Sequence, residues 1–433
     1  MTRRRLAAIQ APIKAAMATY KRHKSLNLAF ADQAMISATN FLTGILVARA
    51  LGITDFGIFS LVWLGVLFTQ SLQQALITSP MLSIGAKESG TAANSYFGAI
   101  LVQQIALAAI FSISLIALAL AATHFRVIDG IEHLILPLAS CVFFTQMHEF
   151  LRRVFFMNGD VFSAFLTDAA RNIPQIAIFS FFLMGPGSIR SVEAALLIIS
   201  GCAGLGIIIA APRAPSISFS ATVAIGIFQR HFHFSKWLVG SALLQWTGSN
   251  IFILASGAFL GPAAAGALRA AQTLVGVTHI FFQATDNIFL PKAARIFRDD
   301  GDIGLRRLTR RVGILALATT GTACALIALP STFWLNLLYG QEYAQFGFLV
   351  VGYAASYMLM ACSAPYRLSL LAREYSAATF SGYIISTAFS LIACYPLVNG
   401  YGLHGAILGI IVTQGIMLAN FYWHHKKLQL PRD

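Results

Sequence analysis

The chain has 433 residues, of which 57% are hydrophobic and 11% are charged, whereas a soluble globular domain has about 45–50% apolar and about 25% charged residues. This composition excludes an ordinary soluble protein and predicts an all-α polytopic membrane protein, because the apolar residues fall in separate stretches of about 20, enough to cross a hydrocarbon core of about 30 Å. The net charge of +14 does not indicate a nucleic-acid partner, because the basic residues concentrate between these stretches, on one side of the predicted membrane.

The apolar stretches predict twelve transmembrane helices. In chain order they are Ala29–Ala48, Gly57–Ser79, Tyr96–Ala121, Leu134–Phe150, Phe162–Met184, Val192–Ala211, Lys236–Phe259, Ala267–Leu290, Val312–Phe333, Gln345–Tyr366, Ala377–Val398 and Gly402–Trp423. Of the 30 Lys and Arg residues, only Arg49, Arg126 and Arg190 fall on external loops, and Arg171 and Arg269 fall inside spans. The remaining basic residues lie on the other side, so the positive-inside rule places both termini in the cytoplasm.

The chain is expected to divide into two lobes at its longest interior polar segment. The predicted parts are a basic cytoplasmic tail (1–25), an N-lobe (26–211), a cytoplasmic inter-lobe linker (212–235), a C-lobe (236–425) and a cytoplasmic C-terminal tail (426–433). An LGxxxxG pattern occurs at Leu51–Gly57 and again at Leu260–Gly266, which indicates an internal repeat. Because each lobe has six helices, the lobes share one orientation and are expected to be related by a pseudo-two-fold axis along the membrane normal, as in many transporters.

Polar residues recur at helical spacing on the first two spans of each lobe, which indicates faces turned away from lipid. In the eighth span, the spacing of the polar residues predicts one continuous polar face, formed by Arg269, Gln272, His279, Gln283 and Asp286. The other candidate cavity residues are Asn40, Arg49, Gln70, Gln74 and Gln245. We expect these four helices to surround a hydrated substrate cavity, although any single Gln or Asn can instead join two helices through a hydrogen bond.

Charged residues within or beside the spans indicate what such a cavity binds. A guanidinium fork suits phosphate oxygens, so Arg269 is a candidate phosphate-binding residue. Arg49 has an equally good alternative as an anchor at the membrane interface. Asp32 and Asp286 are candidate ion-coupling carboxylates near the cytoplasmic ends of their spans, with a plain ion pair to a nearby basic residue as the alternative.

Other features predict structural roles. Asp168 and Arg171 lie three residues apart beside Pro174, a spacing that predicts a neutralised pair within one helix. The five cysteines lie inside apolar spans without a CxxC pair, so neither a disulfide nor a metal site is expected. The sequence has no P-loop, catalytic triad signature or HExxH motif, and its external loops are short. We therefore predict no catalytic residue, no metal and no cofactor.

Three stretches resemble a known family. Asn40–Phe59, NFLTGILVARALGITDFGIF, resembles the N-terminal signature of the polysaccharide transporter (Wzx-like flippase) family of the MOP exporter superfamily. Leu337–Tyr343, LLYGQEY, resembles the pattern after that family's ninth span, and Tyr401–Ala406, YGLHGA, resembles the start of its last span. The span count and the repeat are similar over nearly the whole chain.

The resemblance implies a MOP/MATE-like fold and a non-enzymatic function. It implies a flippase of the bacterial inner membrane that moves polyprenyl-pyrophosphate-linked oligosaccharide from the inner to the outer leaflet by alternating access, for exopolysaccharide, capsule or O-antigen (lipopolysaccharide) assembly. The implied partners are that lipid-linked oligosaccharide, membrane lipid, and polysaccharide polymerase and chain-length machinery.

Three other classes of membrane protein are alternatives to a flippase. A MATE-like cation-coupled antiporter of small molecules is the main alternative, which the two arginines inside spans disfavour. A major-facilitator transporter is disfavoured because the loop after the second span lacks the usual Asp-Arg pattern. A membrane glycosyltransferase or ligase is disfavoured by the short external loops.

Overall fold

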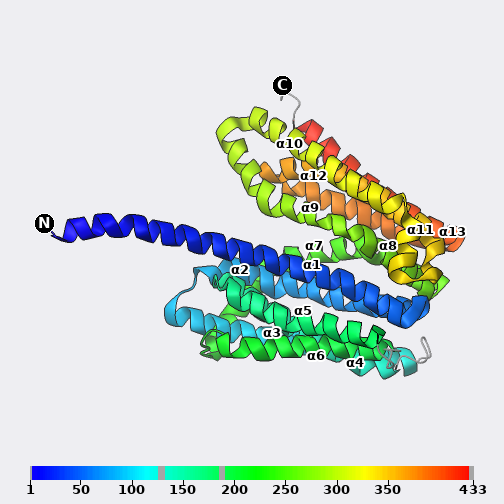
Figure 1. Ribbon diagram of the computed structural model, residues 1–433, viewed down its shortest axis with the longest axis horizontal. Coiled ribbons are helices and arrows are strands. Elements are labelled where there is room, and N and C mark those ends of the chain that lie inside the picture. The colour runs from blue at the N-terminus through cyan, green and yellow to red at the C-terminus, as the bar shows by residue number, and fades with distance from the viewer. Residues whose placement is uncertain (1, 125–131, 185–190, 429–433) are drawn as a thin grey trace. The chain divides into compact units, whose positions relative to one another are not determined.

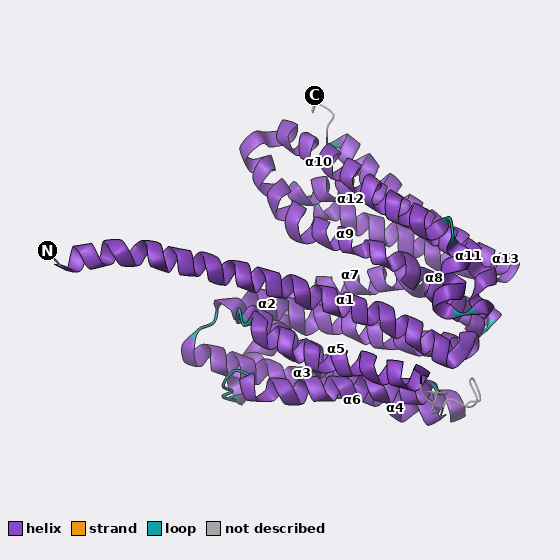
Figure 2. Cartoon of the chain, viewed as in Figure 1, coloured by secondary structure: helices purple, strands orange, loops and turns teal. Residues whose placement is uncertain are grey.

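The computed structural model describes residues 2–124, 132–184 and 191–428, and within these ranges it contains helices and loops but no strand (Figure 2). The α-helices, in chain order (Figure 1), are α1 (Thr2–Gln73), α2 (Ser79–Ile84), α3 (Gly90–His124), α4 (Glu132–Met157), α5 (Val161–Met184), α6 (Val192–Ala210), α7 (Ala221–Leu260), α8 (Pro262–Val275), α9 (His279–Ala284), α10 (Leu290–Ala328), α11 (Ser331–Tyr339), α12 (Gly347–Ala372) and α13 (Ser376–Lys427). The prediction of an all-α protein is confirmed. Arg126 and Arg190 lie outside the described residues.

Eight helical stretches of the described residues are long and apolar enough to cross a membrane. Two of them are too long for one crossing, because Asn27–Ile84 has 58 residues and Ser376–Lys427 has 52, which at 1.5 Å per residue is about 80 Å or more. The first is interrupted at Gly52, with φ 75°, and the second at Gly402, with φ 58°. Glycine adopts these positive φ values without the steric penalty of a Cβ atom, so each long stretch is a pair of helices joined at a glycine.

The expected eighth span, Ala267–Leu290, differs from the prediction of one regular helix. α8 ends at Val275, a 3-10 turn covers Gly276–Thr278, and a π-helical segment, η5 (Thr285–Phe289), leads into α10. Tighter and wider turns rotate the side chains that follow them around the helix axis. The segment is therefore not one regular helix, and a single polar face along it stays a prediction.

The chain folds into two compact units. The first comprises Met1–Thr43, Gln73–Phe181 and Glu193–Ser235, and the second comprises Gly44–Leu72, Phe182–Val192 and Lys236–Asp433. The predicted N-lobe included all of 26–211, whereas Gly44–Leu72 packs within the second unit. The lobe boundaries proposed from the sequence stay a prediction.

The core of the first unit lies where α2, α3 and α4 meet. Met81, Ile100 and Phe150 are each no more than 2% exposed and belong to one cluster of apolar side chains. Beside it, the Gln73 amide donates to Gln104 Oε1 at 3.0 Å and to the backbone carbonyl of Gln146 at 2.7 Å. Because lipid offers no hydrogen-bond partner, such buried amides hold neighbouring helices together.

In the second unit the two LGxxxxG segments pack against each other. A Cβ atom placed on Gly57 would lie 1.8 Å from the carbonyl oxygen of Pro262, and one placed on Gly266 would lie 2.5 Å from the carbonyl oxygen of Ile53. The Cβ atom on Gly266 would also lie 3.1 Å from the backbone nitrogen of Gly57. The repeated glycine therefore marks the point at which the backbones of α1 and α8 touch, an approach that only small residues permit.

Gly57→Ala is expected to destabilise the protein by about 1–3 kcal/mol or more, because the added methyl group meets backbone atoms that cannot rotate away. The measurement is the midpoint of thermal unfolding of the detergent-purified chain. Gly65→Ala is the matched control on the same helix, since nothing lies within 4 Å of a Cβ atom at Gly65. Equal losses in the two variants would show that the contact with α8 does not limit stability.

Candidate functional site

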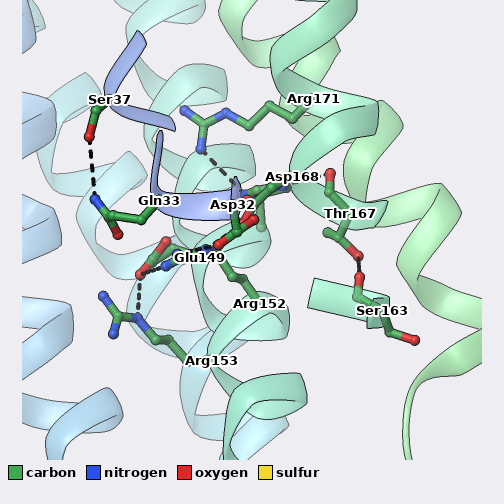
Figure 3. Close-up of polar contacts among 11 residues, drawn as sticks. Asp32, Gln33, Ser37, Glu149, Arg152, Arg153, Ser163, Thr167, Asp168 and Arg171 are labelled. Carbon is green, nitrogen blue, oxygen red and sulfur yellow. Dashed lines mark hydrogen bonds and ion pairs between the residues drawn. The ribbon is translucent and has the colours of Figure 1, made fainter. Parts of the chain in front are cut away.

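The first candidate site is an ion network inside the first unit, centred on Arg152 of α4 (Figure 3). Arg152 Nη2 donates to Asp32 Oδ2 of α1 at 3.0 Å, and Arg152 Nε donates to Asp168 Oδ2 of α5. Asp32 is 1% exposed, Asp168 is 2% exposed and Arg152 is 8% exposed. One buried guanidinium therefore pairs with two buried carboxylates and ties three helices together.

A second layer of charged and polar groups surrounds this centre. Arg153 Nε donates to Glu149 Oε1 at 2.6 Å, and Glu149 Oε1 also lies 3.5 Å from Arg152 Nη1. Arg171 Nη1 lies 3.3 Å from His148 Nδ1, and His148 Nε2 lies 3.3 Å from the Thr167 carbonyl oxygen. This geometry fits a neutral His148 that accepts a hydrogen bond at Nδ1 and donates one from Nε2.

The network is balanced in charge but not fully satisfied in hydrogen bonds. Three arginines (152, 153 and 171) face three carboxylates (32, 149 and 168), so its net charge is zero when His148 is neutral. Asp32 Oδ1 is buried and has no hydrogen-bond partner among the described residues. That oxygen is a free acceptor for a proton or a small cation.

The predicted pairing of Asp168 with Arg171 is not what the structure shows. Asp168 pairs with Arg152, and Arg171 contacts His148 instead, because packing of α4 beside α5 brings a closer guanidinium to the carboxylate. The predicted fourth span ends at Phe150, which leaves Arg152 and Arg153 in a cytoplasmic loop, whereas α4 continues to Met157 and includes both. The sequence does contain a pattern that indicates a helix here. Glu149 lies three and four residues before the two arginines, so all three residues share one helical face.

The second candidate site surrounds Arg269 on α8, in the second unit. Arg269 Nη1 donates to Gln272 Oε1 at 2.8 Å, one turn further along the helix. The phenol groups of Tyr339, Tyr353 and Tyr357 are its electrostatic neighbours. Within the part of the chain that the structure describes, no carboxylate pairs with Arg269. Its other N–H donors remain suited to an anionic ligand.

The tyrosines of this site come from α11 and α12 and are not among the cavity residues predicted from the sequence. The Tyr353 hydroxyl is buried and has no hydrogen-bond partner among the described residues. The Tyr357 ring centroid lies 6.1 Å from that of His279, which begins α9. The spacing of these tyrosines in the sequence indicates a shared position. Tyr353 and Tyr357 are four residues apart and therefore lie on one face of a predicted span.

The other predicted cavity residues belong to both units. They are Asn40 and Gln74 in the first unit, and Gln70, Gln245 and His279 in the second. All but Gln70 are exposed at the surface of the chain, and Gln70 is half-buried. The side chains of Gln283 and Asp286 lie outside the described residues. The assignment of all these residues to one cavity stays a prediction.

Arg49 is exposed and has a structural contact in the second unit. Its Nη2 donates to the Leu337 carbonyl oxygen at 3.0 Å, in the last turn of α11, where backbone carbonyls lack helical partners. Nearby, the ring of Phe56 packs with those of Tyr339 and Tyr343, at centroid distances of 6.5 and 6.4 Å. The first two stretches that resemble the flippase family therefore lie in direct contact.

Comparison with known sequences identifies a family. The family model described as "Polysaccharide biosynthesis protein" matches residues 92–348. The capsular polysaccharide biosynthesis protein CapF of Staphylococcus aureus is 22% identical over 149 residues, which cover 34% of this chain. The match spans 38% of the length of that relative.

Comparison with solved structures identifies the fold. An inward-facing multidrug resistance MATE family transporter of the MOP superfamily is similar with a TM-score of 0.70 at 15% identity, covering 90% of this chain and 96% of that chain. The lipid II flippase MurJ in an inward closed conformation is similar with a TM-score of 0.71 at 12% identity, covering 93% and 87%. The chain therefore has the MOP superfamily fold, as the sequence resemblance implied, and is a multi-pass membrane protein.

Arg152→Leu is expected to destabilise the protein by about 3–5 kcal/mol, because it leaves two buried carboxylates without a counter-charge. The measurement is the thermal unfolding midpoint of the detergent-purified chain. Arg153→Leu is the matched control and is expected to cost about 0–1 kcal/mol, since the Arg153 side chain is 32% exposed and, among the described residues, pairs with Glu149 alone.

Adding Asp32→Asn and Asp168→Asn to Arg152→Leu is expected to recover part of the lost stability, because the unpaired charges are then removed. If Arg152→Leu costs no more than Arg153→Leu, the network does not hold the three helices together.

Proposed function

The chain belongs to the polysaccharide biosynthesis protein family, and on that premise we propose that it is a flippase for polyprenyl-pyrophosphate-linked oligosaccharide. It moves this substrate from the inner to the outer leaflet of a bacterial inner membrane, for exopolysaccharide, capsule or O-antigen assembly. The family match supports a role in polysaccharide biosynthesis, and the similarity in fold to a lipid II flippase supports a lipid-linked substrate. Translocation makes and breaks no covalent bond, so we propose no enzymatic activity.

The observation that carries the substrate class is the environment of Arg269. An arginine within a membrane-spanning segment is costly unless it is paired or lines a hydrated space. Arg269 has a glutamine and three tyrosines near it and, among the described side chains, no carboxylate. A pyrophosphate presents several oxygens that a planar guanidinium fork binds in pairs. We therefore assign Arg269 and Gln272 to the head group of the substrate.

We propose twelve membrane spans with both termini in the cytoplasm. The helix pairs joined at Gly52 and at Gly402 supply two spans each. α5 supplies another, and so does the interrupted segment from α8 to η5. The distribution of basic residues supports this orientation.

We propose that Asp32 couples transport by alternating access to a proton or sodium gradient. Its carboxylate is buried, and its Oδ1 has no hydrogen-bond partner among the described residues, although Oδ2 is held by Arg152. An ion can therefore bind at Oδ1 without displacing Arg152. Asp286 remains a second candidate for this role, on the evidence of its position in the sequence.

The experiment that tests the function measures which leaflet holds the lipid-linked oligosaccharide in a deletion strain. Spheroplasts are treated with an impermeant lectin or glycosidase that reaches only the outer leaflet. We expect the oligosaccharide to accumulate in the inner leaflet and to reach the outer leaflet again when the wild-type chain is restored. Normal outer-leaflet delivery in a strain without other flippases would overturn the proposal and favour the MATE-like antiporter.

Arg269→Ala is expected to lower translocation about tenfold or more in a reconstituted assay, because hydrogen bonds to a charged group contribute about 1.5–3 kcal/mol. Arg269→Lys is expected to be intermediate, since it keeps the charge and loses the planar fork. The control is Arg295→Ala, because Arg295 is exposed and, within the described part of the chain, donates only to the Pro291 carbonyl oxygen of its own helix. Equal translocation by the Arg269→Ala and control proteins would remove Arg269 from the substrate site.

A further inference from the structure

Outside the site around Arg269, the second unit has a groove lined by residues of α10, α12 and α13; Figure 1 shows where these helices lie in the chain. α12 packs against both other helices and forms the floor of a groove with a volume of about 400 Å³. The groove is lined by Arg306, Thr309, Arg310, Gly313, Ile314, Leu317, Ala361, Cys362, Pro365, Tyr366 and His425. None of these residues belongs to the site around Arg269.

The groove is basic at one end and apolar along the rest of its length. Arg306 and Arg310 are four residues apart on α10 and therefore lie on one face, one turn from each other. Ile314 and Leu317 continue that face toward the middle of the helix. Gly313 of α10 lies beside Pro365 of α12, since a Cβ atom placed on it would lie 3.4 Å from the proline ring. A groove with a basic end and an apolar length matches one phospholipid, which has a charged head group and an apolar acyl chain.

The basic end of the groove lies near the break in α10 and the C-terminal end of α13, where basic side chains are concentrated. α10 is broken at Gly301, with φ 61°, so Arg306 and Arg310 occupy the first turns of its second part. The last turn of α13 carries Lys426 and Lys427. The positive-inside rule assigns this end to the cytoplasmic side, so the arginines lie at the level of the inner-leaflet head groups. Basic pockets between transmembrane helices on that side bind anionic lipid head groups.

The two arginines of the groove are free to bind an anion. At the same end of the unit, Arg373 is paired with Asp302 at 3.0 Å. By contrast, neither Arg306 nor Arg310 is paired with a carboxylate among the residues that the structure describes, and both are exposed. Two guanidinium groups one turn apart can bind the oxygens of one phosphate together.

We propose that this groove binds an anionic phospholipid of the inner leaflet. Its phosphate lies between Arg306 and Arg310, and one acyl chain lies along Ile314 and Leu317 over the floor formed by α12. The proposal does not depend on the transported substrate, because the groove and the site around Arg269 share no residue. Its test therefore does not require a transport assay.

The test is a lipid titration of the detergent-purified full chain by native mass spectrometry, with phosphatidylglycerol and zwitterionic phosphatidylcholine as the probes. We expect at least about tenfold tighter binding of phosphatidylglycerol. Arg306→Ala with Arg310→Ala is expected to remove that preference. Arg307→Ala with Arg311→Ala is the matched control, since it removes the same charge from the same turns of α10 outside the groove, and is expected to change binding less than about twofold. Equal losses in the two double variants would overturn the proposal by showing general attraction to a basic surface.

A second variant tests the groove without changing any charge. Cys362 is half-buried in the floor, and Cys362→Trp is expected to fill the groove and to weaken phosphatidylglycerol binding about as much as the double arginine variant. Unchanged binding would place the lipid elsewhere. Each variant is compared with the parent chain by its thermal unfolding midpoint, and a misfolded variant is replaced by Cys362→Phe.

Two competitors identify the source of the phosphate. Glycerophosphoglycerol, the head group without acyl chains, is expected to compete at least about tenfold more weakly than intact phosphatidylglycerol, because it leaves the apolar surface uncovered. Polyprenyl monophosphate is expected to compete no better than phosphatidylglycerol. Stronger competition by polyprenyl monophosphate would overturn the assignment to a bilayer phospholipid and make the groove a site for the carrier lipid.

Discussion

A charged side chain inside a bilayer needs a partner of opposite charge, and Arg152 is that partner for two carboxylates at once. Asp32 and Asp168 are on different helices, so their shared guanidinium fixes how α1, α4 and α5 pack in the first unit. A pair of this kind adds little net stability over an apolar core, but losing one partner is costly. The network therefore acts mainly as a constraint on arrangement, with one carboxylate oxygen, Asp32 Oδ1, left available for an ion.

The second unit depends on a steric constraint instead. The LGxxxxG segments bring α1 and α8 into backbone contact at Gly57 and Gly266. That contact holds the first turn of α8, which precedes Arg269 on the same helix. Arg49 of α1 binds the last turn of α11. In lipid, where apolar burial gives little drive for helices to associate, close packing of this kind and hydrogen bonding supply the affinity.

Some arginines of the described residues are paired with carboxylates and others are not. The proposed binding sites lie at the unpaired arginines. Arg152 is paired with Asp32 and Asp168, whereas Arg269, Arg306 and Arg310 have no carboxylate partner among the described residues. The environments of the unpaired arginines differ. Arg269 is half-buried among tyrosines, and Arg306 and Arg310 are exposed at the mouth of an apolar groove. The same cationic chemistry can thus bind a transported head group at one place and a resident lipid at the other.

The sequence by itself determined that this is a polytopic helical membrane protein and that two glycine segments repeat, because hydropathy over 20 residues and a motif such as Leu51–Gly57 are local properties of the chain. It also selected Arg269, since an arginine inside an apolar span is visible without a structure. Only the tertiary structure decided which side chains contact the buried arginines. Arg152 meets Asp32 across 120 positions of sequence, and Tyr353 and Tyr357 approach Arg269 from another helix. Such contacts depend on which helix faces pack together. The spacing of residues along the sequence predicts which of them share a helix face, but it does not predict which other helix packs against that face.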